Sequence, residues 1–186
     1  WLVPGRIQAE DYDDGGDGYA YHDTTTGNGL GWYRYDGVDI EPTSDVDGLW
    51  DVGSTAAGEY LRYAVTSSSG WYDLTFRIAS SGLGGTFHLE VDGVNKTGTL
   101  TVPDTGDFQV FTNVTKPTVG LAAGAHTVRL VLDTVGTNGA VGNFNWLEFA
   151  SVAAPPQPEV SVAAIGTNLS LQVSTVVGPS YVLEST

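Results

Sequence analysis

Apolar and polar side chains alternate in short runs along most of the chain, with the period of a half-buried β-strand. The alternation is clearest in residues 71–79 (WYDLTFRIA) and 127–133 (TVRLVLD). Gly and Asp-Gly turns separate these runs, as in an antiparallel β-sandwich. Further strands are expected over residues 7–10, 60–66, 86–91, 98–102, 108–112, 118–121 and 142–149. The pattern predicts an all-β fold class.

The stretch GNFNWLEF combines two asparagines with large apolar residues. Strict strand alternation would place Asn143 and Asn145 on one face and Phe144 on the other. The apolar Leu147 and Phe149 would then continue the asparagine face. This strand should therefore run from a polar, open end of the fold into a buried core.

A second polar pair lies near the start of the chain, where Gln8 and Glu10 share one face of an expected strand. If the first and last strands lie side by side, these two side chains and Asn145 converge on one oxygen-rich pocket. Carboxamide and carboxylate oxygens suit a polar ligand or a hard cation. The alternative is that Gln8 and Glu10 only decorate the end of a strand.

Residues 13–51 are rich in glycine, aspartate and aromatic residues and have no helical period. A loop of this length inside a compact domain usually has a function or is held in place by other groups. Asp11, Asp13, Asp14 and Asp17 at its start form a candidate second cation site. A solvated acidic loop is the alternative.

The sequence changes character after Ser151, where AAPPQP forms a stiff polyproline-type segment. We therefore divide the chain into a β-sandwich domain (1–151), a linker (152–158) and a C-terminal segment (159–186). That segment holds three short strand-like runs, which are too few to bury a core alone. We expect it to be the beginning of a second β domain or an appendage of the first.

Charge and composition narrow the possible partners. The chain has 186 residues, with 7 Lys+Arg against 22 Asp+Glu and a formal net charge of −15. Such a field repels nucleic acids and other polyanions and favours neutral ligands and cations. Cysteine is absent, which excludes disulfides, thiolate zinc sites and cysteine nucleophiles. No apolar run has the length of a membrane span, so we expect no membrane partner. The negative charge argues against a nucleic-acid partner, and we expect the protein to be a monomer.

The segments IQAEDY, AGEYLRYAV, GWYDLTFRIAS, TVPDTGDFQVF, LAAGAHTVRL and GNFNWLEF occur in this order between residues 7 and 149. Together they resemble the family 6 carbohydrate-binding modules. The resemblance implies a jelly-roll sandwich of two antiparallel sheets, a structural calcium ion near the terminal strands and a ligand cleft in the loops at one end. Some members have a second site on the concave sheet face. Since these modules are appended to secreted polysaccharide-degrading enzymes, it also implies a secreted bacterial protein with an attached catalytic domain.

By this resemblance, Gln8, Glu10 and Asn145 are the expected ligands of the calcium ion (Ca²⁺). A hard cation of this kind takes six to eight oxygens, including carboxylate, carboxamide and backbone carbonyl oxygens. Members usually have an acid at the position of Asn145, so the amide lowers the charge of this ligand set.

In members of this family, two aromatic rings stack on either side of a pyranose, and an asparagine forms a hydrogen bond with it. Stacking works because the C–H face of a sugar is apolar and its edge is polar. Asn143 matches that asparagine, and Phe108 stands where members usually have tryptophan. The second platform would fall at Ser54, and serine cannot stack on a sugar.

The long acidic insert offers replacements for the missing ring. The candidates are Trp32, Tyr33, Tyr35 and Trp50. His22 lies near the position where some members have an acid that contacts the ligand. The alternative is that these rings cap the core of the sandwich.

The sequence therefore predicts a non-catalytic module that binds a neutral polysaccharide, such as agarose, a β-glucan or xylan, and brings an attached glycoside hydrolase to it. One alternative is an architectural or adhesive surface module that binds no sugar, and another is a small polysaccharide-degrading enzyme. Against catalysis, the chain has no HExxH zinc motif, no nucleophile elbow and no phosphate-binding glycine loop.

Overall fold

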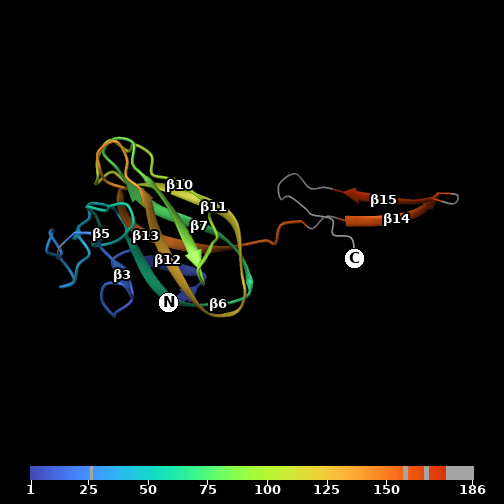
Figure 1. The fold of residues 1–186 in the computed structure, drawn as a ribbon, viewed down its shortest axis with the longest axis horizontal. Coiled ribbons are helices and arrows are strands. Elements are labelled where there is room, and N and C mark those ends of the chain that lie inside the picture. The colour runs from blue at the N-terminus through green and yellow to red at the C-terminus, as the bar shows by residue number, and fades with distance from the viewer. Residues whose placement is uncertain (26, 157–158, 166–167, 175–186) are drawn as a thin grey trace. The chain divides into compact units, whose positions relative to one another are not determined.

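The structure is a computed structural model that describes residues 1–25, 27–156, 159–165 and 168–174. The chain divides into two compact units, Trp1–Val152 and Ala153–Thr186. The described part of the chain contains β-strands and no α-helix, which confirms the predicted all-β class (Figure 1). Among these residues there is no helix of the length and hydropathy needed to cross a membrane.

The first sheet of unit 1 has the strand order β1-β6-β12-β8-β10, with β3 beside β6 and β9 beside β8. Its long central strands are the amphipathic runs of the sequence, because each presents an apolar residue to the core at every second position. The bounds are β1 (Leu2–Val3), β3 (Tyr21–His22), β6 (Tyr60–Ser67), β8 (Thr86–Val91), β9 (Val94–Asn95), β10 (Leu100–Thr101) and β12 (Gly124–Thr134).

The second sheet has the order β11-β7-β13-β5-β4, and β2 pairs with β13. Its bounds are β2 (Gly5–Gln8), β4 (Ile40–Pro42), β5 (Trp50–Val52), β7 (Gly70–Ala79), β11 (Thr112–Leu121) and β13 (Asn143–Val152). Trp146 lies opposite Gln8 in the antiparallel pair of β2 and β13. The expectation that the first and last strands of the domain lie side by side is therefore confirmed.

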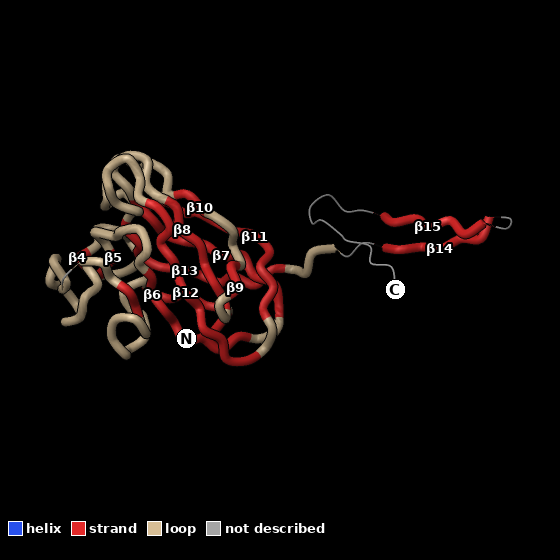
Figure 2. The backbone as a smooth tube through the Cα atoms, viewed as in Figure 1, coloured by secondary structure: helices blue, strands red, loops and turns tan. Residues whose placement is uncertain are grey.

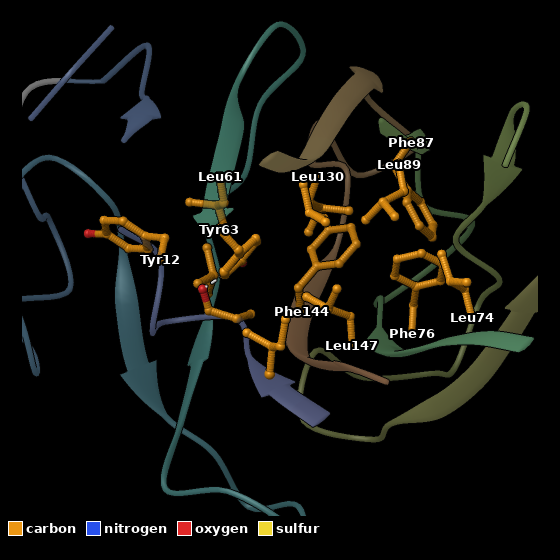
Figure 3. Packing of buried hydrophobic residues seen from close by; sticks show 14 of the residues in the cluster. Tyr12, Leu61, Tyr63, Leu74, Phe76, Phe87, Leu89, Leu130, Phe144 and Leu147 are labelled. Carbon is orange, nitrogen blue, oxygen red and sulfur yellow. Dashed lines mark hydrogen bonds between the residues drawn. The ribbon is translucent and has the colours of Figure 1, made fainter. Parts of the chain in front are cut away.

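The two sheets pack face to face through aromatic and branched aliphatic side chains (Figure 3). Phe87 of the first sheet contacts two rings of the second sheet, with its ring centroid 5.0 Å from Phe76 and 5.2 Å from Phe144. Both contacts are edge-to-face, the arrangement that aromatic pairs prefer. The hydroxyl of the fully buried Tyr63 donates a hydrogen bond of 2.9 Å to the carbonyl oxygen of Ala9, so this polar group inside the core is satisfied.

Strand β13 does not keep the strict alternation that its sequence predicts. Asn145 forms a bulge between Phe144 and Trp146, where the register against β7 shifts. A bulge inserts one residue and reverses the faces beyond it. Phe144 therefore lies in the core with Leu147 and Phe149, and the prediction that Asn143 shares their face is wrong.

The connections also differ from the sequence pattern in two places. The predicted strand over 108–112 is wrong, because residues 108–111 form no strand; the next strand is β11, which continues without a break to Leu121. Within 13–51 the chain forms the short strands β3, β4 and β5. The loops around β4 and β5 lie at one end of the sandwich (Figure 2).

In the second unit, β14 (Glu159–Ile165) and β15 (Asn168–Ser174) form an antiparallel pair. They cover two of the three strand-like runs expected there. The third, residues 181–183, lies outside the described residues.

Candidate functional site

Three oxygen atoms from the predicted cation ligands are buried without a hydrogen-bond partner: Gln8 Oε1, Glu10 Oε2 and Asn145 Oδ1. Pairing of β2 with β13 brings Gln8 beside Asn145, and Glu10 follows directly after β2. Each buried, unpaired polar atom costs about 1–3 kcal/mol. Three such oxygen atoms within one site therefore favour the binding of a small, positively charged ligand.

Gly48 shows how closely two of these oxygens approach. A Cβ atom at Gly48 would lie 2.5 Å from Asn145 Oδ1 and 3.3 Å from Gln8 Oε1. Its φ of +129° also disfavours a side chain. Two carboxamide oxygens are thus directed at the backbone of one glycine, and only a residue without a side chain leaves the space beside them open.

The orientation of the Asn145 carboxamide follows from its nitrogen. Nδ2 donates to Asp45 Oδ2 and to the carbonyl oxygen of Asp47, both at 2.9 Å. Since both partners are acceptors, the nitrogen must face them and the oxygen must face Gly48. Asp45 is itself held by Arg77, whose Nε and Nη2 each donate at 2.7 Å.

Burial is the main cause that raises the pKa of Glu10, to about 8, and the nearby acids Asp11 and Asp51 add to it. A carboxyl with this pKa keeps its proton at neutral pH, and a cation that binds there displaces that proton. Gln8, Glu10 and Asn145 supply one negative charge and two neutral oxygens, which fits Ca²⁺ when backbone carbonyls and water complete its shell. Among the described residues no three His, Cys, Asp or Glu side chains cluster as metal ligands, so this mixed set is the cation candidate.

The acids at the start of the long insert already have partners. These pairs are Asp11 with the Tyr33 hydroxyl, Asp13 with Arg62, Asp14 with Arg34 and Asp17 with His22. Four carboxylates bound to four different groups do not converge on one point. The geometry therefore gives no support to a second cation site there.

Three of the predicted ring residues form one cluster, which we call the ring cluster: Trp32, Tyr33 and Trp50. The ring centroid of Trp50, on β5, lies 5.5 Å from Trp32 and 5.9 Å from Tyr33. Trp32 is 49% exposed and Tyr33 is 51% exposed, while Trp50 is partly buried beneath them. The ring cluster therefore presents apolar ring surface to solvent on a partly buried base.

Two surface cavities adjoin the ring cluster and share Tyr33 as a wall. An open one of about 520 Å³ is lined by Asp14, Tyr33, Arg34, Tyr35 and Asp36. A second, of about 270 Å³, is lined by Gln8, Glu10, Tyr33, Gly48, Leu49 and Trp50. Tyr35 is fully exposed, and its ring has no aromatic neighbour in the described part. The second cavity joins the ring cluster to the cation candidate.

Asn143 is buried, and its nitrogen is already bound. Nδ2 donates to Glu41 Oε1 at 2.7 Å and to Asp51 Oδ1 at 2.9 Å. Gln109 Nε2 bridges the same two carboxylates, at 3.1 Å to Glu41 and 2.9 Å to Asp51. We call these four residues the acid–amide cluster. Burial raises the pKa of Asp51 to about 7, and the charge of Glu41 adds to this.

Among the described residues, neither Phe108 nor His22 has a ring contact with the ring cluster. Phe108 is partly buried on the turn that also carries Gln109. His22, on β3 of the first sheet, pairs with Asp17 at 2.9 Å, and its ring centroid is 6.1 Å from that of Tyr60. Ser54 is exposed with a φ of +50°. As glycan contacts, Phe108, His22 and Asn143 stay predictions.

Asn143→Ala is expected to lower the free energy of unfolding at pH 7 by about 1–3 kcal/mol, because Glu41 and Asp51 lose a shared donor. Chemical denaturation measures this. Asn113→Ala is the control: Asn113 is exposed on β11 and only accepts a solvent-exposed hydrogen bond of 3.2 Å from Arg77, so its loss should change stability by less than about 0.5 kcal/mol. Equal stability of the two variants would contradict the bridging role.

Residues 32–151 match the family described as carbohydrate binding module (family 6). A family 6 module from Clostridium cellulolyticum, solved in complex with xylose, is 28% identical, with a TM-score of 0.60 over 81% of this chain and 100% of that one. A module from Cellvibrio mixtus lichenase 5A, in complex with cellotriose, is 29% identical, with a TM-score of 0.58 over 81% and 98%. A β-1,3-glucan-binding module from Bacillus halodurans is 25% identical, with a TM-score of 0.60 over 81% and 98%.

A longer relative is the clotting factor G alpha subunit of Tachypleus tridentatus, 28% identical over 124 residues, or 65% of this chain. The chain spans 18% of the length of that subunit. The family match covers well over half of the sequence, and unit 1 has the two-sheet sandwich of the solved relatives. This chain therefore belongs to carbohydrate-binding module family 6.

Proposed function

We propose that this protein binds a neutral polysaccharide through the ring cluster and catalyses no reaction on it. The observation that carries the proposal is the half-exposed pair Trp32 and Tyr33 above Trp50. An open aromatic face suits the apolar C–H face of a pyranose. The solved relatives support this class of ligand, since one is in complex with xylose, one with cellotriose, and one binds β-1,3-glucan.

The charges beside the ring cluster favour an uncharged glycan. Arg34 is the one cation that lines the open cavity, and its guanidinium pairs with both Asp14 and Asp36. An anionic polymer would meet these acids and a chain of net charge −15. Agarose, β-glucans and xylan therefore fit better than alginate or carrageenan.

The proposed role is to hold an attached glycoside hydrolase on its polymer, as a monomeric module of a secreted bacterial protein. The relative from lichenase 5A is a module of an enzyme, which supports this arrangement. Tethering raises the effective concentration of substrate without new contacts. We also propose that Gln8, Glu10 and Asn145 hold Ca²⁺, supported by their three unpaired buried oxygens.

Affinity electrophoresis tests the binding function. Native gels cast with agarose, xylan, laminarin and barley β-glucan should retard the protein in at least one case. Reducing-sugar release from the same polymers should stay at background. Free migration in all four gels would overturn the proposed binding and favour the architectural alternative, which the burial of Asn143 also favours.

Trp32→Ala is expected to weaken binding to the retarding polymer about tenfold. A sugar that covers about 50–60 Å² of ring gains about 1.4 kcal/mol, which is one decade in affinity. Tyr19→Ala is the matched control, because Tyr19 is a similarly exposed ring and its aromatic face is covered by Arg62 of β6. Calorimetry or gel retardation series measure both. Equal losses in the two variants would contradict a ligand contact at Trp32.

A further inference from the structure

We propose that the cation candidate holds the ring cluster in place, so that calcium occupancy controls glycan affinity although the sugar need not touch the ion. This proposal rests on the proposed glycan function and adds a regulation to it. It follows from three physical connections between the oxygens of Gln8, Glu10 and Asn145 and the rings of Tyr33 and Trp50.

The first connection is a shared wall. Gln8 and Glu10 line the cavity of about 270 Å³ together with Tyr33 and Trp50. Gln8 and Glu10 are two of the three residues of the cation candidate, and Tyr33 and Trp50 are two of the three residues of the ring cluster. A change in the position of the oxygens therefore changes the surface against which the rings rest.

The second connection runs through the two ends of the Asn145 carboxamide. Its oxygen is unpaired and faces Gly48, while its nitrogen donates to Asp45 and to the carbonyl of Asp47. The segment so held leads through Gly48 and Leu49 directly into Trp50. An ion that binds the oxygen fixes the carboxamide and with it the approach of the chain to Trp50.

The third connection leads to Tyr33. Its hydroxyl donates a hydrogen bond of 2.6 Å to Asp11, the residue after Glu10. Its backbone has a φ of +63°, which is uncommon for a residue with a large side chain and persists only where neighbouring contacts hold it. Glu10 and Tyr33, which both line the cavity, are thus linked through one residue.

Without a cation, the oxygens of Gln8, Glu10 and Asn145 stay buried without partners, so the segments that carry them gain by moving apart and hydrating these oxygens. Hard-cation binding reverses this and draws the oxygens together. Because these segments also carry Trp50 and contact Tyr33, the ring cluster should become fixed at the same time. A ring surface that is already ordered loses less entropy when it binds a sugar.

The first test uses the protein without any glycan. Calcium addition to the chelator-treated protein should change the near-UV circular dichroism and the tryptophan fluorescence. The reason is that Trp50 lines the cavity and the ring of Trp32 packs against the ring of Trp50. Glu10→Gln should remove the change. Glu90→Gln is the matched control, because Glu90 Oε2 is also buried without a hydrogen bond but lies on β8 in the other sheet, 3.6 Å from Arg129 Nη1. An unchanged spectrum at a calcium concentration that raises the unfolding temperature would overturn the proposal.

The second test measures glycan affinity. Cellotriose and laminarin are titrated calorimetrically into the protein with 5 mM calcium chloride or with EDTA, roughly saturating and depleting a typical site. We expect affinity to fall at least about tenfold in EDTA and in Glu10→Gln, and Glu90→Gln to retain calcium-dependent binding. Equal affinity with and without calcium overturns the regulation and leaves the glycan function intact. Absence of binding in both conditions, together with free migration in all four gels, removes the glycan function, and this proposal with it.

Discussion

Saturating calcium is expected to raise the unfolding temperature of this protein by roughly 10 °C. A ligand at about a thousand times its dissociation constant adds about 4 kcal/mol to the stability of the state that binds it. For a chain of this size about 1 kcal/mol corresponds to roughly 2–4 °C. The effect should be large because binding also satisfies the unpaired oxygens of Gln8, Glu10 and Asn145. Scanning calorimetry with calcium and with EDTA measures it.

Glu10→Gln should lose most of that shift, because it removes the single negative charge among the three residues. In EDTA at pH 7 the variant should be about as stable as the parent, since with a pKa of about 8 the Glu10 carboxyl is then mostly protonated, and both side chains are neutral. Glu90→Gln should keep the full calcium shift. If the parent protein unfolds at the same temperature with calcium and with EDTA, the cation proposal is wrong.

The sandwich was predictable because its long strands carry their own signal. Each of β6, β7, β8 and β12 alternates buried and more exposed positions along its length. This alternation is a property of neighbouring residues and needs no knowledge of the partner strand. The bulge at Asn145 has no such signal, because the register of β13 is decided by its pairing with β7. Because of this one inserted residue, the sequence pattern placed Phe144 on the face opposite Leu147 and Phe149, whereas all three lie in the core.

The sequence predicted the residues of the cation candidate but not the acid–amide cluster. Gln8, Glu10 and Asn145 follow from strand pairing plus residue chemistry, and the structure brings their oxygens into one site, whereas ion binding itself stays a prediction. The acid–amide cluster was missed. Asn143 bonds Asp51 and Glu41 from 92 and 102 positions away, and nothing local in the insert indicates which of its many acids turns inward.

The same insert explains why the ring residues could only be proposed as a group. Trp32 and Tyr33 lie in a loop without regular structure, and their position depends on β5, which carries Trp50. Tyr35, two residues further, is fully exposed. Adjacent aromatic residues in an irregular segment have no period from which to predict their directions.

Stability should fall as pH rises from about 4 to about 7, and Asp51 should cause much of the fall. Burial raises the pKa of Asp51 from 3.8 to about 7 in the folded protein. Between these values the native state holds a proton that the unfolded state has lost, so unfolding becomes more favourable with each unit of pH. About three units at about 1.4 kcal/mol each give on the order of 4 kcal/mol.

Asp51→Asn should flatten this dependence, because the variant has no proton to lose at this position. Denaturation series from pH 4 to pH 8, all at saturating calcium so that Glu10 stays bound, give the free energy of unfolding at each pH. Asp104→Asn is the control, since Asp104 is exposed and its asparagine keeps an acceptor for Gly82 and Gly106. The control should retain the slope of the parent. An equal slope in Asp51→Asn would mean that the acid–amide cluster keeps Asp51 ionised through its donors Asn143 and Gln109, which outweigh its burial.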